Sequence, residues 1–197
     1  MFFLQTNGSG VLSFSSVSSD FVKLAEVSST NFYTASFDGY FSSTYDSYQI
    51  HFYNLGFVAS RDLHVRFRIA NADVTSSDYK YGTLSNPYFD VNGSGNGTQI
   101  NNSWSSTFIK LNNDGCGTGT DSYQTQGILY LQNPLNTSTY KMCMGDFAFM
   151  GTATNIMKRE SFVGSLQSAT TALSGITFYL SSDYFTKGTF VLYGIKR

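Results

Sequence analysis

The stretch that decides the fold is residues 48–53, Tyr-Gln-Ile-His-Phe-Tyr, followed by residues 62–69, Asp-Leu-His-Val-Arg-Phe-Arg-Ile. In both runs apolar and polar side chains alternate with a period of two, which indicates β-strands with one buried face. A helix would spread Arg66 and Arg68 around its axis instead of keeping them on one side. Two adjacent half-buried strands need a second layer over their apolar face, so the pattern predicts an all-β protein with a β-sandwich.

The composition agrees with this fold class. The chain has 197 residues, with 18 Phe and 14 Tyr against 13% charged residues, and a sandwich of this length forms one domain. We expect roughly nine to eleven strands in a single domain over residues 20–197, including residues 21–27 and 32–37 joined by a hairpin loop at 28–31. Residues 160–173 are the best helix candidate, but Gly164 and many Ser and Thr argue against a helix there.

Residues 1–19 differ in composition from the rest of the chain, and this composition predicts an N-terminal attachment arm. A turn at residues 7–10, Asn-Gly-Ser-Gly, interrupts any long strand or helix. The apolar residues on either side of it are Phe2, Phe3, Leu4, Val11, Leu12 and Phe14. Such side chains gain most from burial in a groove of another protein.

Residues 72–105 form a polar, Gly-rich passage that is too long for a simple connection, so we expect an exposed, mobile loop that carries binding. Its aromatic residues Tyr79, Tyr81, Tyr88 and Trp104 are candidate ligand or partner contacts, because aromatic faces stack on sugars and other partners. A carbohydrate-binding, lectin-like module is therefore an alternative function.

His51, His64, Arg66 and Arg68 are expected to share one sheet face with neighbouring tyrosines. Two interpretations are open: a solvated face with cation–π contacts, or a subunit contact, since Arg and Tyr are favoured at interfaces. Neither interpretation implies catalysis.

Catalytic and cofactor signatures are weak. The chain has two histidines, two glutamates and no GxSxG or HExxH motif, so we expect no enzyme, no catalytic residue, no cofactor and no metal. Asp146 and other aspartates near Gly, Tyr or Asn are interpreted as turn residues. Residues 112–121, Asn-Asn-Asp-Gly-Cys-Gly-Thr-Gly-Thr-Asp, offer oxygen ligands for calcium, but no glutamate closes the loop and a surface loop without a ligand is the stronger interpretation. Cys116 and Cys143 are expected to be free thiols.

Charge and hydropathy limit the partners. A net charge of −1 gives no field that favours nucleic acid or an anionic membrane. No apolar run reaches the roughly 20 residues of a membrane-spanning helix, and the N-terminus lacks the basic flank of a signal peptide. The 17% aromatic content instead predicts self-association.

Four segments resemble a family of bacteriophage virion proteins. Residues 4–14, LQTNGSGVLSF, resemble the leader before C-terminal modules of tail-fibre and other virion proteins of marine and cyanobacterial phages. Residues 41–52, FSSTYDSYQIHF, are similar to the family's F-SS-YD-Y-I-F strand, and residues 63–69 to its LRLR strand. Residues 187–196, KGTFVLYGIK, are similar to its terminal strand SGTFTLYGIK. Together the segments cover about a third of the chain, in family order.

This resemblance implies a jelly-roll-like antiparallel sandwich on the virion surface, often a homotrimer, without enzymatic activity. The implied partners are other virion proteins, through the arm, and a host-surface glycan during attachment. The family's leader follows a long upstream region, whereas here it starts at Met1. A tail-fibre tip and a separate capsid-decoration protein therefore both stay open.

Overall fold

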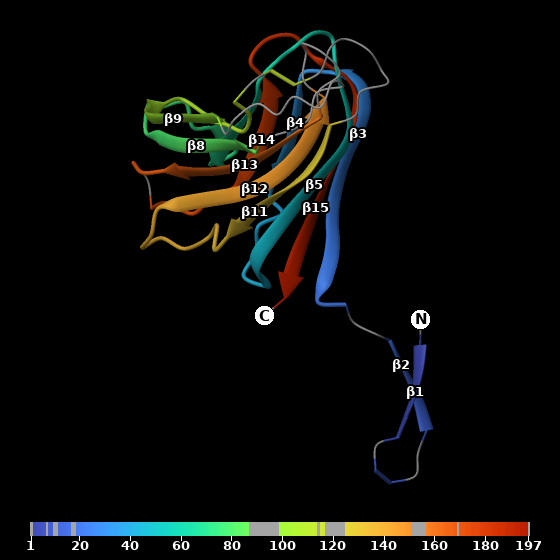
Figure 1. Ribbon diagram of the computed structural model, residues 1–197. Helices are drawn as coiled ribbons and strands as arrows, with labels where there is room; N and C mark the ends of the chain where they lie inside the picture. Colours follow the sequence, from blue (N-terminus) through green and yellow to red (C-terminus); the bar gives the residue numbers. More distant parts are fainter. Residues whose placement is uncertain are drawn as a thin grey trace.

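A computed structural model describes residues 2–6, 8–9, 12–16, 19–86, 99–113, 115–116, 125–150, 157–168 and 170–196. These residues form an all-β structure in which two antiparallel sheets pack as a sandwich, and no helix occurs among them (Figure 1). The predicted fold class is therefore confirmed, and a jelly-roll arrangement is consistent with it.

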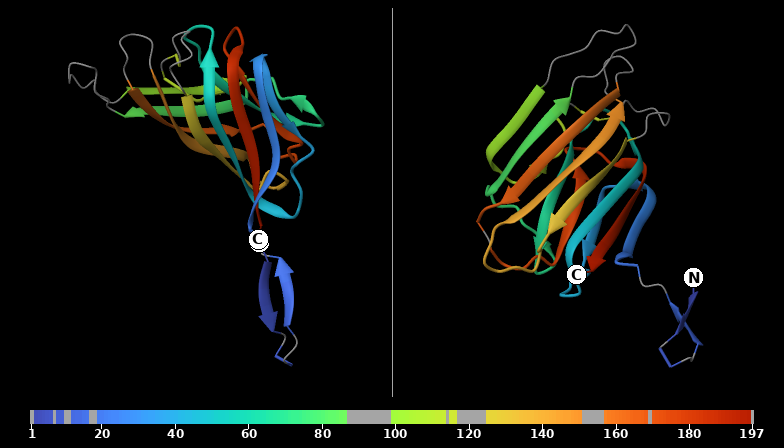
Figure 2. Two further views of the ribbon diagram at one scale, coloured as in Figure 1. Left: turned by 90° about the vertical axis from the view of Figure 1, so that its right-hand side faces the viewer. Right: turned by 60° about the horizontal axis from the view of Figure 1, so that its bottom comes forward.

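The larger sheet has eight strands in the order β3-β15-β5-β11-β12-β13-β8-β9. Their bounds are β3 Phe21–Phe32, β15 Phe185–Lys196, β5 Tyr45–Phe57, β11 Thr125–Gln132, β12 Lys141–Met150, β13 Met157–Leu166, β8 Tyr79–Asn86 and β9 Gln99–Ser106. The right-hand view of Figure 2 shows them side by side in this order. The sheet twists strongly, so β8 and β9 run across the direction of β3 and β15 (Figure 1).

The smaller sheet has five strands and covers the inner face of the larger one. Four follow the order β10-β6-β14-β4, and a short β7 pairs with β6. Their bounds are β10 Ile109–Lys110, β6 Leu63–Ile69, β14 Gly175–Leu180, β4 Thr34–Asp38 and β7 Ala72–Asp73.

The core lies between the sheets and is rich in phenylalanine. Phe178 of β14 lies 6.0 Å from Phe52 of β5 and 5.0 Å from Phe190 of β15, measured between ring centroids. These contacts join the two sheets at the centre of the molecule. The residues predicted to face inward on β5 and β6 are buried, apart from a half-buried Ile69: Tyr48, Ile50, Phe52, Leu63, Val65 and Phe67.

The expectation that residues 48–53 and 62–69 form adjacent strands of one layer is wrong. β5 pairs with β11 and β15 in the larger sheet, whereas β6 pairs with β14, β10 and β7 in the smaller one. The chain crosses between the sheets through residues 58–62, so the two apolar faces meet across the core. Alternation shows which face of a strand is buried, but not which strand lies beside it.

Two loop predictions also need correction. Residues 28–31 continue β3, because β15 supplies partners along its whole length, from Ile195 opposite Phe21 to Phe185 opposite Phe32. Residues 72–105 contain β7, β8 and β9, and β8 pairs with β13. Residues 87–98 lie outside the described part of the chain.

The N-terminal residues form a two-stranded sheet of their own, β1 (Phe2–Thr6) and β2 (Leu12–Ser16). Figures 1 and 2 show this hairpin beyond the end of the sandwich at which β3 begins. Val11 and the side chains of Phe2, Phe3, Leu4, Leu12 and Phe14 lie outside the described residues. Their predicted contact with another protein stays a prediction.

Candidate functional site

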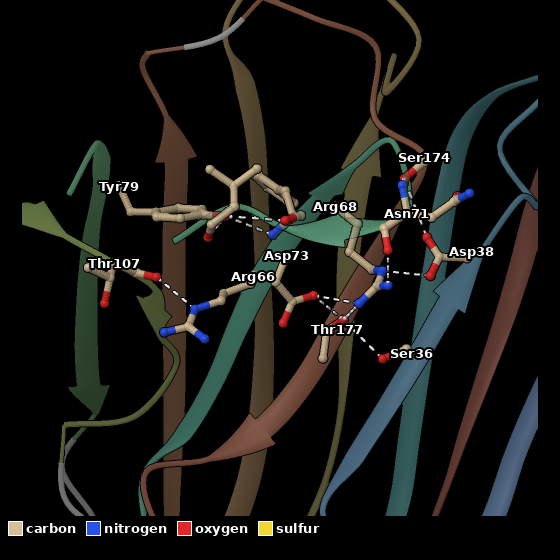
Figure 3. A network of polar contacts seen from close by, with 12 residues as sticks. Ser36, Asp38, Arg66, Arg68, Asn71, Asp73, Tyr79, Thr107, Ser174 and Thr177 are labelled. Atoms are coloured by element: carbon tan, nitrogen blue, oxygen red, sulfur yellow. Dashed lines mark hydrogen bonds and ion pairs between the residues drawn. The ribbon is translucent and has the colours of Figure 1, made fainter. Parts of the chain in front are cut away.

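A polar network covers the outer face of the smaller sheet (Figure 3). Arg68 is at its centre: its Nε lies 2.6 Å from an oxygen of Asp38, and its Nη1 lies 2.6 Å from an oxygen of Asp73. The guanidinium also donates hydrogen bonds to the Thr177 hydroxyl at 3.1 Å and to the Asn71 carbonyl at 2.5 Å. Arg68 therefore finds its partners within the chain and ties β4, β6, β7 and β14 together.

Arg66 and His64 lie on the same face of β6. Arg66 donates from Nε to the Thr107 carbonyl at 2.9 Å, and its guanidinium lies 4.8 Å from the centre of the Tyr179 ring. The His64 ring stacks on Phe108 with 3.9 Å between centroids and is only 5% exposed. Burial lowers the pKa of His64 from 6.5 to about 4. The burial of His64 contradicts one of the two open interpretations, that of a solvated face, at this position.

His51 does not share this face, contrary to expectation. It lies on the outer face of β5 in the larger sheet, with its ring centroid 4.9 Å from that of Tyr193 and 6.0 Å from that of Phe21. Its Nε2 is 3.0 Å from the side-chain oxygen of Gln49. The predicted group of four residues is thus divided between the outer faces of two sheets.

The outer side of the larger sheet carries an unusual number of exposed apolar side chains over β8, β9, β11, β12 and β13. We call six of them, together with the positions between them, the apolar face: Leu84, Ile100, Tyr130, Met142, Met144 and Val163. Ile100 is 70% exposed and Met144 is 58% exposed. The strand register aligns Leu84 with Ile100, and Met144 with both Tyr130 and Val163.

Three adjacent hollows lie along this side of the sheet. The central one measures about 510 Å³ and is lined mainly by the apolar face, with Gly82 and Asp146. A second hollow of about 410 Å³ shares Asp146 and extends to His51 and Tyr53. A third hollow, of about 300 Å³, shares Gly82 with the central one and reaches Trp104. Because neighbouring hollows share lining residues, we refer to the three together as the groove.

The groove carries few charges. Asp146, at the junction of two hollows, accepts a hydrogen bond from the Ser161 hydroxyl at 2.5 Å and lies 3.3 Å from an Arg159 nitrogen. It belongs to β12 and is not a turn residue. Lys80 at the other end of the groove lies 5.4 Å from the centre of the Trp104 ring.

The four aromatic ligand candidates have different positions. Tyr79 is fully buried, and its hydroxyl accepts a hydrogen bond from the Phe67 amide at 2.9 Å, so it is a core residue and not a surface contact. Tyr81 is half-buried and packs against the core, although it lines the third hollow. Trp104 is 76% exposed on β9. Tyr88 lies outside the described residues.

The calcium candidate at residues 112–121 lies largely outside the described residues. Among the described residues, no group of three or more His, Cys, Asp or Glu side chains is placed to hold a metal ion. The same residues include no helix long and apolar enough to cross a membrane. Cys116 and Cys143 are free, as predicted, and both are buried.

No protein-family model matches the chain, and no curated protein matches it. Solved structures with a weak likeness to this chain include the following two. One is a marine PL-14 alginate lyase from Aplysia kurodai, with 8% identity over 99% of this chain and 85% of that chain and a TM-score of 0.25. The other is the infectious bursal disease virus Gx strain, with 12% identity over 96% of this chain and 40% of that chain and a TM-score of 0.14. At these scores neither structure bears on function.

Proposed function

We propose that this chain is a non-enzymatic structural protein of a bacteriophage virion, of tail-fibre or capsid-decoration type, that displays its β-sandwich on the particle surface. The observation that carries the proposal is the position of the β1–β2 hairpin beyond the end of the sandwich (Figure 1). At that end the first and last strands of the sandwich meet, and the Lys196 amide donates to the Asp20 carbonyl at 2.8 Å. The four segments that resemble phage virion proteins support the same function.

In this function the arm attaches the protein and the sandwich is displayed. The hairpin joins another virion protein, and the sandwich is held at the end where β3 starts and β15 stops. The apolar composition of the arm favours burial in a partner groove, at ~25 cal/mol per Å² removed from water. Because the resembling phage proteins are often homotrimers, the proposal includes a homotrimer on the virion.

Deleting residues 1–19 tests the attachment. We expect the melting temperature of the isolated protein to stay nearly unchanged, while incorporation into particles is lost. A full-length variant with Phe2, Phe3 and Leu4 replaced by Ser is the matched control, because it keeps the length of the arm and removes three of its apolar side chains. Normal incorporation of the deletion variant would overturn the proposal, and loss of folding would show that the arm belongs to the core.

Carbohydrate binding is a second candidate, favoured by the hollow beside Trp104. An exposed indole there lies next to the hydrogen-bonding side chains of Asn102 and Gln167 and to Lys80. An aromatic platform with a few polar groups suits a sugar ring. Binding on a glycan array that is lost in Trp104→Ala, but kept in Tyr33→Ala at an exposed aromatic on the β3–β4 connection, would support this role.

A further inference from the structure

The side of the sheet that carries the apolar face has the size of a protein interface. Strands about 4.8 Å apart and a two-residue repeat of about 6.8 Å give each outward position roughly 33 Å². The five strands have about twenty outward positions, polar ones such as Lys80 and Asn102 included, or roughly 650 Å², against the ~800 Å² that each partner contributes to a standard interface. Contiguous exposed apolar patches of a few hundred Å² mark interaction sites on soluble proteins.

The chemistry of the face favours a protein over a sugar. Its central hollow is mostly apolar, with Leu84, Ile100, Met144 and Val163 beside the polar side chains of Asn102, Asp146 and Ser161, so most of its surface offers a sugar no hydrogen bonds. Methionine is flexible and polarisable, and it is enriched in interfaces. Met142 and Met144 are 57% and 58% exposed, so they are free to enter the hollows of a partner surface.

The charges of the face fit a second copy of the same surface. Asp146 and Arg159 lie together on it, and their side chains are 47% and 65% exposed. Because each copy supplies both signs, two copies can face each other with Asp146 near the partner's arginine, without bringing like charges together. We propose that a second copy of this chain covers the apolar face.

The proposed interface differs from the predicted subunit contacts on β6, which were His64, Arg66 and Arg68. Arg68 is already paired with Asp38 and Asp73, and His64 is buried beneath Phe108. The apolar face, in contrast, has exposed side chains that a partner can bury. The proposal does not rest on a place in the virion, since it concerns the isolated protein.

Sedimentation velocity of the full chain tests the proposal. At micromolar concentration the protein should sediment as a species larger than one chain, with two chains expected from a face that pairs with itself. Met144→Glu puts a charge at the centre of the face and should weaken association by at least roughly tenfold, the effect of one interface hot spot. Tyr140→Glu is the matched control, because Tyr140 is 56% exposed in the connection before β12, outside the face, and its association should not change.

Methionine oxidation gives an independent readout. Met142→Glu should also weaken association, and its circular dichroism should match that of the unaltered protein. Peroxide should therefore oxidise Met144 more slowly in the assembled, unaltered protein than in Met142→Glu. A single-chain species for the unaltered protein would overturn the proposal, and so would equal association of Met144→Glu and Tyr140→Glu. Glycan binding by a single chain, lost in Met144→Glu, would assign the face to carbohydrate instead. Failed particle incorporation with intact association would contradict only the attachment function.

Discussion

Arg68 Nε lies 2.6 Å from Asp38 Oδ2, and this ion pair joins β6 to β4 across the intervening strand β14. The side chains are only 18% and 30% exposed, so water screens the pair incompletely. Replacing Arg68 by Met would leave both Asp38 and Asp73 without their cation. We expect the free energy of unfolding in urea to fall by about 2–3 kcal/mol.

A second arginine provides the control. Arg159 pairs with Asp146 at 3.3 Å, but the two side chains are 65% and 47% exposed. Exposed pairs contribute little, so Arg159→Met should change the free energy of unfolding by about 0.5 kcal/mol or less. Similar losses in both variants would show that the Arg68 network does not stabilise the smaller sheet.

Tyr79→Phe should destabilise the protein although it removes only one oxygen. The Tyr79 hydroxyl accepts from the Phe67 amide at 2.9 Å and donates to the Val74 carbonyl at 3.2 Å. Without it the buried Phe67 amide loses this partner, at a cost of about 1–2 kcal/mol in urea unfolding. Tyr81→Phe, whose hydroxyl bonds no other described residue, should be nearly neutral. An equal effect of the two changes would contradict a special role of the Tyr79 hydroxyl.

Alternation predicted the inner faces of β5 and β6 correctly, but it missed β13. On that strand the inward face mixes charged and apolar residues: Lys158 and Glu160 are buried beside Phe162, whereas Met157 and Val163 are exposed. Glu160 accepts hydrogen bonds from the Ser85 hydroxyl and, at 3.3 Å, from the Asn113 amide. Those partners come from distant parts of the chain, so no local pattern could have revealed that a buried carboxylate is tolerated there.

The candidate site was predicted only in part. Trp104 could be recognised as an exposed aromatic in a polar segment, and it lines the groove. Leu84, Ile100 and Val163 were missed, because an outward apolar residue looks the same in sequence as an inward one. Only the order β11-β12-β13-β8-β9 brings them together, and this order depends on pairings between strands far apart in the chain.

The thiols of Cys116 and Cys143 should be unreactive in the folded protein. Both are buried, and burial raises the pKa of each thiol, to about 12 for Cys143. The thiolate is the reacting species, so a disulfide-exchange reagent should label neither residue at neutral pH and both in denaturant. Rapid labelling of the native protein would show that the sandwich opens at one of these positions.

The stability of the protein should depend on pH in mildly acidic solution, mainly through His64. Burial is the main cause of its low pKa, Lys110 and Arg66 lower it further, and Asp62 opposes them. The folded protein therefore takes up this proton near pH 4, whereas the unfolded chain takes it up near pH 6.5. As the pH falls below 6.5, the unfolded state binds the proton first and becomes more stable relative to the folded state.

The stability contributed by neutral His64 should thus be complete above pH 6.5 and lost progressively between pH 6.5 and about 4, in total ~3 kcal/mol. Urea unfolding at several pH values in this range measures the loss. His64→Phe keeps an aromatic ring against Phe108 and has no proton to bind, so its stability should vary much less with pH. His51→Phe is the control, because His51 is only half-buried, and it should keep most of the pH dependence. If the free energy of unfolding varied with pH in the same way for the unaltered protein and for His64→Phe, His64 would take up its proton in the folded protein as readily as in the unfolded chain.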